Sequence, residues 1–171
     1  MPANKISLKK AKQDHLFYVV ANVVVYRESD GRCLILKRGK HEKVHPGKYG
    51  VIGGKLEWSD LDVNNPTRIH GDVLDFEDAA EKLLMREAKE EAGIEIEPVL
   101  AYINSVAFVR TDGIPAILVK FAAKYEGGEV ALEQDAFDDY VWVNENEVKT
   151  YDCLEGIPEE ISKTIQLFQI K

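Results

Sequence analysis

Cysteine is scarce in this sequence of 171 residues, which contains two, Cys33 and Cys153. They lie far apart in the chain and form no Cys-x-x-Cys pair. This spacing argues against a disulfide framework and against a zinc site built on cysteine pairs. Without disulfides, the reducing cytoplasm is the location that the sequence predicts.

Long hydrophobic runs are also lacking. The longest, Leu16–Tyr26, covers about half of a membrane span and is interrupted by Asn22. The first fifteen residues are polar and basic, and no apolar stretch of the kind found in signal peptides follows them. We therefore expect a cytoplasmic protein that does not enter a membrane.

Positive charge is in deficit, because 22 Lys and Arg residues stand against 30 Asp and Glu residues, for a formal net charge of −8. A protein this acidic repels a polyphosphate backbone, so DNA or RNA is an unsuitable partner. An acidic enzyme acting on small phosphates needs cations to bridge the repulsion, which points to metal ions. The chain length and the hydrophobic content of 45% predict one globular domain over residues 1–171.

Segments rich in β-branched and aromatic residues predict strands over residues 16–26, 32–38, 49–52, 94–97, 99–109, 114–125 and 139–143. Pro158 opens an amphipathic helix over residues 159–169, in which Ile161, Ile165 and Phe168 share one face. Strands on both sides of a long central helix, followed by this closing helix, indicate an α/β (α+β) fold with a mixed sheet between helices.

The central helix is the strongest in the sequence and covers Phe76–Ala92. Asp75 is the expected N-cap, and Gly93 is the expected left-handed C-cap. The preceding residues 58–74 show no sustained period and contain Asn64-Asn65-Pro66. We predict a long surface loop there, and a loop of this length inside a compact domain is often functional.

Three glutamates near the end of this helix, Glu87, Glu90 and Glu91, stand at positions i, i+3 and i+4, so their carboxylates converge on one side. Glu87 and Glu91 fall on the same stripe as the apolar residues. Like charges turned toward a low-dielectric interior are costly unless a counter-charge is present. Hard divalent cations such as Mg²⁺ take oxygen ligands and supply that charge. The alternative is a solvated acidic face whose glutamates pair with Lys82 and Lys89.

Two segments resemble the halves of the Nudix box, whose pattern is Gly, five residues, Glu, seven residues, then Arg-Glu-U-x-Glu-Glu-x-Gly-U with U bulky and apolar. Gly53–Glu57 (GGKLE) is similar to the first half, and Arg86–Ile94 (REAKEEAGI) to the second. His45–Tyr49 (HPGKY) and Tyr140–Val143 (YVWV) resemble the flanking parts of the family pattern. The resemblance covers about residues 16–169 and implies a Nudix-type α/β/α sandwich.

The sequence departs from the family pattern in the length of the box. Counting from Gly54, the pattern places its arginine at position 68, whereas the matching Arg86 lies 18 residues later. Arg68 is not the equivalent residue, because Ile-His-Gly follows it. We place about one helical turn of the excess at the helix start and the remainder in the 58–74 loop, as an insertion inside the box.

The same departure leaves the middle glutamate of the box without a secure equivalent. Counting back from Arg86 points to Asp78, and Glu77 and Glu57 are the nearby alternatives. Which of the three assists the metal site stays open at the level of the sequence.

The resemblance implies a Mg²⁺ site, with Mn²⁺ as an alternative metal, whose ligands are Glu87, Glu90 and Glu91. Arg86 would orient these carboxylates, and Glu91, Glu87 and Arg86 are the expected catalytic residues. In-line attack of water on phosphorus would follow, with metal ions lowering the pKa of that water. The general base stays open among several acidic residues: Glu91, Glu133, Asp135, Asp138 and Asp139.

Four residues in and just after the first half of the box are candidates for binding substrate. Gly53 and Gly54 lack a Cβ, so a phosphate can approach their backbone closely. Lys55 can contact phosphate oxygens, although an exposed surface lysine is an equal alternative. Trp58 can stack on a base, although packing is the more frequent role of an aromatic residue beside a long loop.

The expected function is metal-dependent hydrolysis of a phosphoanhydride bond in a nucleoside di- or triphosphate-type substrate, with a (d)NTP giving a nucleoside monophosphate and pyrophosphate. One alternative is a hydrolase of nucleoside diphosphate sugars or ADP-ribose. Others are a Nudix-fold sensor that binds a nucleotide without turnover and an acidic helix that binds Ca²⁺. The expected partner is a small nucleotide, and the implied fold also allows a homodimer.

Overall fold

The computed structural model describes residue 9 and residues 11–169, so much of the polar N-terminal segment lies outside the described residues. A mixed sheet has the strand order β10-β2-β1-β9-β7, with β3 on β2, β4 on β1 and β8 on β9. The strands are β1 (Tyr18–Arg27), β2 (Arg32–Arg38), β3 (Tyr49–Gly50), β4 (Ile52–Lys55), β7 (Glu95–Ile96), β8 (Ala101–Val109), β9 (Pro115–Gly127) and β10 (Phe137–Val143). They confirm the predicted strands to within a few residues.

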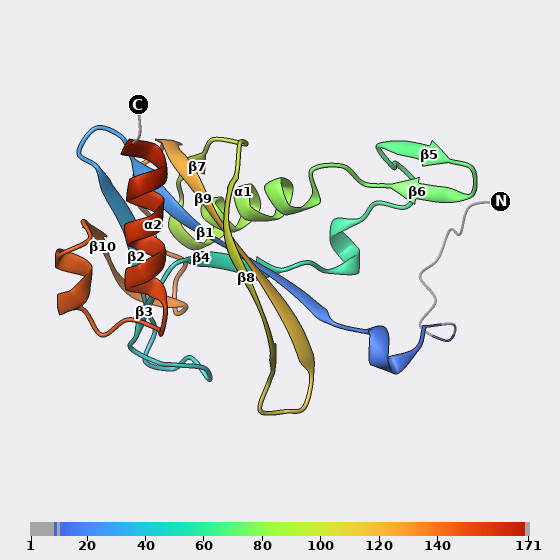
Figure 1. The fold of residues 1–171 in the computed structure, drawn as a ribbon, viewed down its shortest axis with the longest axis horizontal. Coiled ribbons are helices and arrows are strands. Elements are labelled where there is room, and N and C mark those ends of the chain that lie inside the picture. The colour runs from blue at the N-terminus through green and yellow to red at the C-terminus, as the bar shows by residue number, and fades with distance from the viewer. Residues whose placement is uncertain (1–8, 10, 170–171) are drawn as a thin grey trace.

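The sheet lies between two helices, α1 (Ala79–Ala92) and α2 (Ile157–Gln169), which cover opposite faces (Figure 1). Strand β1 runs parallel to β9 and antiparallel to β2 and β4, so the sheet is mixed as predicted. In β1, Val23 and Val25 pack in the core with α1, and Val24 and Tyr26 pack in the core with α2. This alternation explains the unbroken apolar run, because both faces of the strand are covered.

The start of α1 differs from the prediction. The helix begins at Ala79 instead of Phe76, and its N-cap is Asp78, in a left-handed conformation with φ 58°. The expected N-cap, Asp75, instead ends a strand, where it pairs with Arg68 across a hairpin, and its carboxylate accepts a hydrogen bond from Arg68 at 3.1 Å. The end agrees with the prediction, since Gly93 is the C-cap at φ 70°.

The sequence predicts a long surface loop over residues 58–74, and this segment has secondary structure of its own. It contains a 3-10 turn, η3 (Trp58–Asp60), and most of a hairpin of β5 (Arg68–His70) and β6 (Val73–Asp75). This hairpin projects from the main body beyond the start of α1 (Figure 1). The prediction failed because the strands are short and largely exposed, so they carry no buried alternating pattern.

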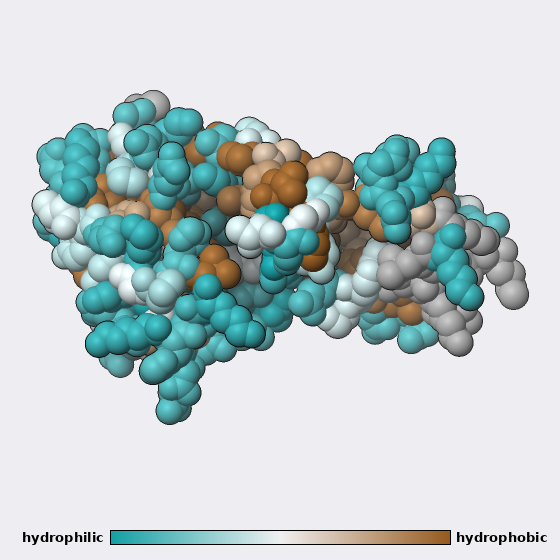
Figure 2. Space-filling view, turned by 90° about the horizontal axis from the view of Figure 1, so that it is seen from below, coloured by the Kyte–Doolittle hydropathy of each residue, from teal (hydrophilic) through white to brown (hydrophobic). Residues whose placement is uncertain are grey.

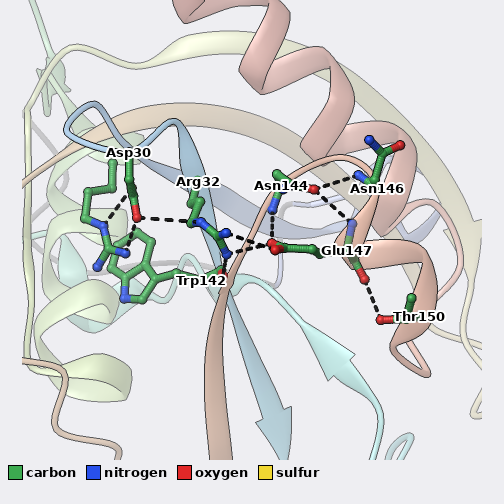
Figure 3. Close-up of polar contacts among 8 residues, drawn as sticks. Asp30, Arg32, Trp142, Asn144, Asn146, Glu147 and Thr150 are labelled. Carbon is green, nitrogen blue, oxygen red and sulfur yellow. Dashed lines mark hydrogen bonds and ion pairs between the residues drawn. The ribbon is translucent and has the colours of Figure 1, made fainter.

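At the other end of the sheet, a polar network ties β2 to the segment after β10 (Figure 3). Arg32 donates to both carboxylate oxygens of Glu147, at 2.6 and 2.9 Å, and to the carbonyl of Trp142 at 3.0 Å. Glu147 belongs to η4 (Glu147–Thr150), and it also accepts a hydrogen bond from the backbone of Asn144 at 3.0 Å. The network holds η4 beside the sheet.

Helix α2 begins one residue before Pro158, at Ile157, and buries Ile161 and Ile165 as predicted. Its Phe168 stacks on Tyr26 of β1 at 5.3 Å between ring centroids. The described part of the chain contains no helix long and apolar enough to cross a membrane.

The side of the molecule toward which the β8–β9 hairpin points is mostly hydrophilic, with hydrophobic residues gathered near its middle (Figure 2). Exposed hydrophobic side chains in β1 and β8 include Tyr18, Val106 and Phe108.

Candidate active site

The two glycines of β4 lie directly against the glutamates of α1. The backbone N–H of Gly53 donates to the carboxylate of Glu91 at 3.1 Å. A Cβ on Gly54 would lie 2.3 Å from Oε1 of Glu87, and one on Gly53 would lie 2.2 Å from Oδ1 of Asn22. A Cβ on Gly53 would also lie 2.7 Å from the backbone carbonyl oxygen of Ala21, so glycine is required there. At Gly54 a Cβ would displace the side chain of Glu87.

Glu87, Glu90 and Glu91, which we call the glutamate cluster, differ in environment. The side chain of Glu87 is 14% exposed and that of Glu90 is 54% exposed. Burial raises the pKa of Glu91 to about 8, and the negative charges of Glu87 and Glu133 add to the increase, against the hydrogen bond from Gly53. Burial also raises the pKa of Glu87, against the opposing effect of Arg86. Burial therefore disfavours the charged form of two carboxylates, and Arg86 offsets this only in part at Glu87.

Arg86 is bound to three carboxylates at once. It lies 2.9 Å from Glu90, 3.1 Å from Glu87 and 3.3 Å from Asp60. Asp60 ends the 3-10 turn η3, and its other carboxylate oxygen accepts the backbone N–H of Glu57 at 2.8 Å. The guanidinium thus joins the first half of the box to the helix that carries the second half.

Asp60 was missed by the sequence reasoning, which counted back from Arg86 and considered Asp78, Glu77 and Glu57. No contact described for those three reaches Arg86: Asp78 caps the helix, and Glu77 pairs with Arg68 at 2.6 Å. Counting forward from Gly54 instead, five residues intervene and position 60 follows, as in the family pattern. The extra residues therefore fall between Asp60 and Arg86, and this forward count was the available signal.

Lys55 and Trp58 are not brought to the glutamate cluster. Lys55 is exposed at the end of β4, and Trp58 is 57% exposed in η3. No described hydrogen bond or ion pair joins either side chain to Glu87, Glu90 or Glu91.

The loop acids differ in their relation to the cluster. The backbone N–H of Glu133 donates to the carbonyl of Glu91 at 3.0 Å, and the negative charge of Glu133 raises the pKa of the Glu91 carboxyl. Asp139 instead accepts the hydroxyl of Tyr49 at 2.9 Å. Asp135 has a left-handed backbone with φ 66°, and Asp138 is exposed. Of the loop candidates, Glu133 is the one whose charge reaches Glu91.

The donor set near Gly53 suits a hard divalent cation, because it consists of carboxylate oxygens and includes two acids whose burial calls for positive charge. As the side chains lie, no three acidic, histidine or cysteine residues of the described chain converge closely enough to hold a metal ion. Arg86 holds Glu87 and Glu90, so these carboxylates must change orientation to share an ion.

A second polar cluster, which the sequence analysis did not single out, lies on the α2 face of the sheet. Lys120 of β9 forms an ion pair with Glu160 of α2; the side chain of Glu160 is buried and that of Lys120 is 12% exposed. Asn104 Oδ1, Glu160 Oε2 and Thr164 Oγ1 are buried and have no hydrogen-bond partner among the described residues. Asn22 of β1 pairs with Lys120 of β9 in the sheet. Its Oδ1 lies 2.2 Å from the position that a Cβ on Gly53 would take. Buried polar atoms without partners are costly, so this cluster is a second place to look for ligand contacts.

The fold and the site together define a class of α/β proteins in which a glycine strand presses against an acidic helix. The family model for the NUDIX domain matches residues 17–165. The chain therefore belongs to the Nudix family, and its identification from sequence as a Nudix hydrolase is confirmed. None of the curated protein sequences compared with the chain matches it.

Solved structures share the fold at low sequence identity. The MutT protein of Methanosarcina mazei Go1 is 21% identical, with a TM-score of 0.61 over 95% of this chain and 99% of that one. The NUDIX domain of Shewanella oneidensis NrtR complexed with ADP ribose is 14% identical, with a TM-score of 0.64 over 96% and 94%. A C. elegans Ap4A hydrolase is 16% identical, with a TM-score of 0.57 over 88% and 96%. These likenesses support the fold.

Proposed function

We propose that the protein is a divalent-metal-dependent hydrolase that cleaves a phosphoanhydride bond in a nucleoside di- or triphosphate-type substrate. The observation that carries the proposal is the placement of Glu91, partly buried, bound to the backbone N–H of Gly53 and beside Glu87. A purely structural helix gains no stability from two acids in this position. In a site that binds a cation and a phosphate, the same two carboxylates can hold the cation.

Glu87, Glu90 and Glu91 would hold the metal, which we assign as Mg²⁺ with Mn²⁺ as an alternative. When bound, the ion supplies charge neutralisation at the phosphate oxygens and lowers the pKa of water. Arg86 and Asp60 act as positioning residues, because their ion pair joins α1 to η3, the turn that follows the glycine strand. Asp60 takes the place of the middle glutamate of the box in this assignment.

The chain's own groups define the remaining steps. Gly53 and Gly54 let the side chains of Asn22 and Glu87 lie against the strand backbone, which holds Glu87 at the site. Glu91 or Glu133 accepts the proton of the attacking water, and the position of Glu133 beside Glu91 favours it among the loop acids. The bond from phosphorus to the bridging oxygen breaks, and that oxygen leaves with the second product.

The first substrate candidate is a (d)NTP, cleaved to a nucleoside monophosphate and pyrophosphate. The second is a nucleoside diphosphate sugar or ADP-ribose, and one observation favours it: an open cavity beside Arg86, lined by the segment inserted in the box. The NUDIX domain of NrtR is in complex with ADP ribose, which is in keeping with this second candidate.

Product analysis over a substrate panel tests the proposal. The panel holds canonical and oxidised (d)NTPs, ADP-ribose, nucleotide sugars and dinucleoside polyphosphates, each with Mg²⁺, Mn²⁺ or chelator. Wild type is compared with Glu91→Gln and with Glu95→Gln, an exposed acid that pairs with Lys89 at 3.3 Å. We expect metal-dependent phosphoanhydride cleavage in wild type and Glu95→Gln, and its collapse in Glu91→Gln.

The same panel separates the enzyme from a nucleotide sensor. A sensor would bind a nucleotide tightly and turn over none of the substrates with either metal. That outcome would refute the proposed function.

A further inference from the structure

Strand β8 forms one edge of the sheet, and in the described part of the chain it pairs only with β9. Its sequence, AYINSVAFV, contains no charged residue and no proline. The last five residues, Ser105–Val109, are all exposed, and an irregularity of the pairing between Tyr102 and Asn104 lies before them. Natural proteins usually protect such an edge with charges, proline or bulges, because its free N–H and C=O groups can pair with another strand.

The opposite edge of the sheet, β10, is built differently. Its sequence includes Asp138 and Asp139, and its pairing with β2 is irregular between Phe137 and Asp139. Charge and irregular pairing are the protections that natural edge strands use. Of the two edges, β8 is therefore the one that remains able to pair.

The β8–β9 hairpin, which projects from the body of the sheet (Figure 1), shows which backbone groups of β8 are free. At its turn, the backbone N–H of Arg110 donates to the carbonyl of Ile114 at 3.0 Å. Alternate residues of an antiparallel strand direct their backbone groups to opposite sides, so those of Phe108 and Val106 also point to β9. The backbone groups of the intervening residues point to the free edge: Ser105, Ala107 and Val109.

The free stretch of β8 is complementary to itself. Ala107 is its centre, and an antiparallel pair of identical strands is symmetric about one such residue. Pairing about Ala107 places Val106 of each copy opposite Phe108 of the other, and these side chains are 43% and 41% exposed. Contacts between an aromatic and a β-branched residue across two strands stabilise a sheet. No like charges meet along the stretch, although the chain carries a net charge of −8.

The same register gives the turn of the second copy a place beside α2. It brings residues 110–113 of that copy to the level of Tyr102 and Ile103. These two residues line an open cavity of about 260 Å³ together with three residues of α2: Lys163, Gln166 and Leu167. The turn carries Asp112, whose side chain remains 44% exposed in its ion pair with Arg110. Its negative charge is complementary to that of the exposed Lys163.

We propose that β8 is the surface through which two copies of this chain associate, as an antiparallel strand pair centred on Ala107. The glutamate cluster faces β4, which pairs with β1 on the side opposite β9, so association leaves the proposed active site open. The inference does not depend on the proposed function. The contact uses fewer residues than the about 20 to 30 on each side of a standard interface, so we expect a weak dimer with a Kd in about the micromolar range.

Sedimentation equilibrium from nanomolar to nearly millimolar protein measures the association. Val106→Lys places a charged side chain against Phe108 of the second copy, twice in each dimer. We expect it to raise the Kd of the dimer about tenfold or more. Val99→Lys is the matched control, because it adds the same charge at a residue that is 75% exposed and lies outside β8. It should change the Kd less than about twofold.

Ala107→Pro tests the backbone pairing. The N–H of Ala107 points away from β9, so proline there removes hydrogen bonds to the second copy and none within the hairpin. We expect a monomer whose circular dichroism spectrum matches that of wild type.

Cysteine substitutions test the register. Ala107→Cys puts two cysteines at the symmetry axis, with the Cα separation of about 5.5 Å that a disulfide can span. Ser105→Cys is the matched control on the same strand, since its symmetry mate lies about 13 Å away. On mild oxidation we expect a cross-linked dimer from Ala107→Cys. Neither Ser105→Cys nor wild type, whose Cys33 is buried, should give one.

A dimer that weakens in Val106→Lys and Ala107→Pro and persists in Val99→Lys would support the inference. Wild type that stays monomeric over the whole concentration range would overturn it, and so would a dimer that Val106→Lys leaves unchanged. Where a variant proves unfolded by circular dichroism, the cross-linking decides. Equal cross-linking of Ala107→Cys and Ser105→Cys, or none in either, would reject the strand pair.

Discussion

The two sides of Arg86 differ in how they are held. On one side, the glutamate cluster is pressed against β4, where Gly54 leaves no space for a Cβ beside Glu87. On the other side, the inserted segment projects from the body, and its hairpin is held by exposed ion pairs such as Arg68–Asp75. Buried contacts define the first side closely, whereas exposed ion pairs contribute little to stability. The proposed chemistry therefore lies on the closely packed side.

The largest effect is expected from breaking the close contact on the closely packed side. Gly54→Ala forces Glu87 to move, because the new Cβ would lie 2.3 Å from its carboxylate. A displacement of about 1 Å at reacting groups costs about 100-fold in rate, and we expect a loss in kcat of that order. Gly127→Ala is the control, since a Cβ there meets nothing within 4 Å. Steady-state rates with the preferred substrate measure both, and equal activity of the two variants would contradict the assignment.

The next largest effect is expected from substituting Arg86, with Arg68 as its control. Arg86→Ala removes the group that binds Asp60, Glu87 and Glu90, and we expect activity or metal affinity to fall about 10- to 100-fold. Arg68→Ala removes an exposed residue of the hairpin and should change kcat less than about twofold. Metal titrations of activity measure the two variants. A large loss in Arg68→Ala alone would mean that the box arginine had been assigned to the wrong residue.

A smaller effect is expected for Asp60→Asn. Asparagine keeps an acceptor for the backbone N–H of Glu57 but removes the charge that faces Arg86. Because partly exposed ion pairs contribute up to about 1 kcal/mol, we expect a loss of up to about fivefold in kcat/KM. Asp112→Asn breaks a comparable ion pair with Arg110, outside the site, at 2.9 Å and should leave kcat/KM unchanged. A loss of the same size in Asp112→Asn would remove the special role of Asp60.

The last effect concerns stability alone. Glu91 has a pKa raised to about 8 in the folded protein, so folding favours its protonated form. Without metal, the stability of wild type therefore falls as pH rises from the ordinary glutamate range to about 8, and it falls no further from this cause above that value. Glu91→Gln cannot ionise and escapes this loss.

With chelator present, Glu91→Gln should match wild type in Tm at pH 4 and exceed it by about 5 °C at pH 9. Adding Mg²⁺ at pH 9 should raise the Tm of wild type more than that of the variant. Thermal unfolding followed by circular dichroism measures both differences. A variant that is less stable than wild type at pH 9 in chelator would show that the Glu91 charge is already compensated.

Sequence alone determined the sheet and the glutamate helix well. The run Leu16–Tyr26 predicted a buried strand, and β1 packs against both α1 and α2. Gly93 ended the central helix where predicted, because a left-handed C-cap is a local property of the chain. The spacing of Glu87, Glu90 and Glu91 identified the acidic helix, since three glutamates at helical spacing need no distant information.

Tertiary structure decided the features that depended on distant neighbours. Helix α1 begins at Ala79 and not at the predicted Phe76, because Asp75 is paired with Arg68 in a hairpin. The strands of this hairpin are exposed, so they carry no alternating hydrophobic pattern. Asp60 became a partner of Arg86 across 26 positions of sequence, a contact that no local period encodes. Glu87 and Glu90 likewise differ because of β4, since burial against a glycine strand, not residue type, leaves the side chain of Glu87 14% exposed and that of Glu90 54% exposed.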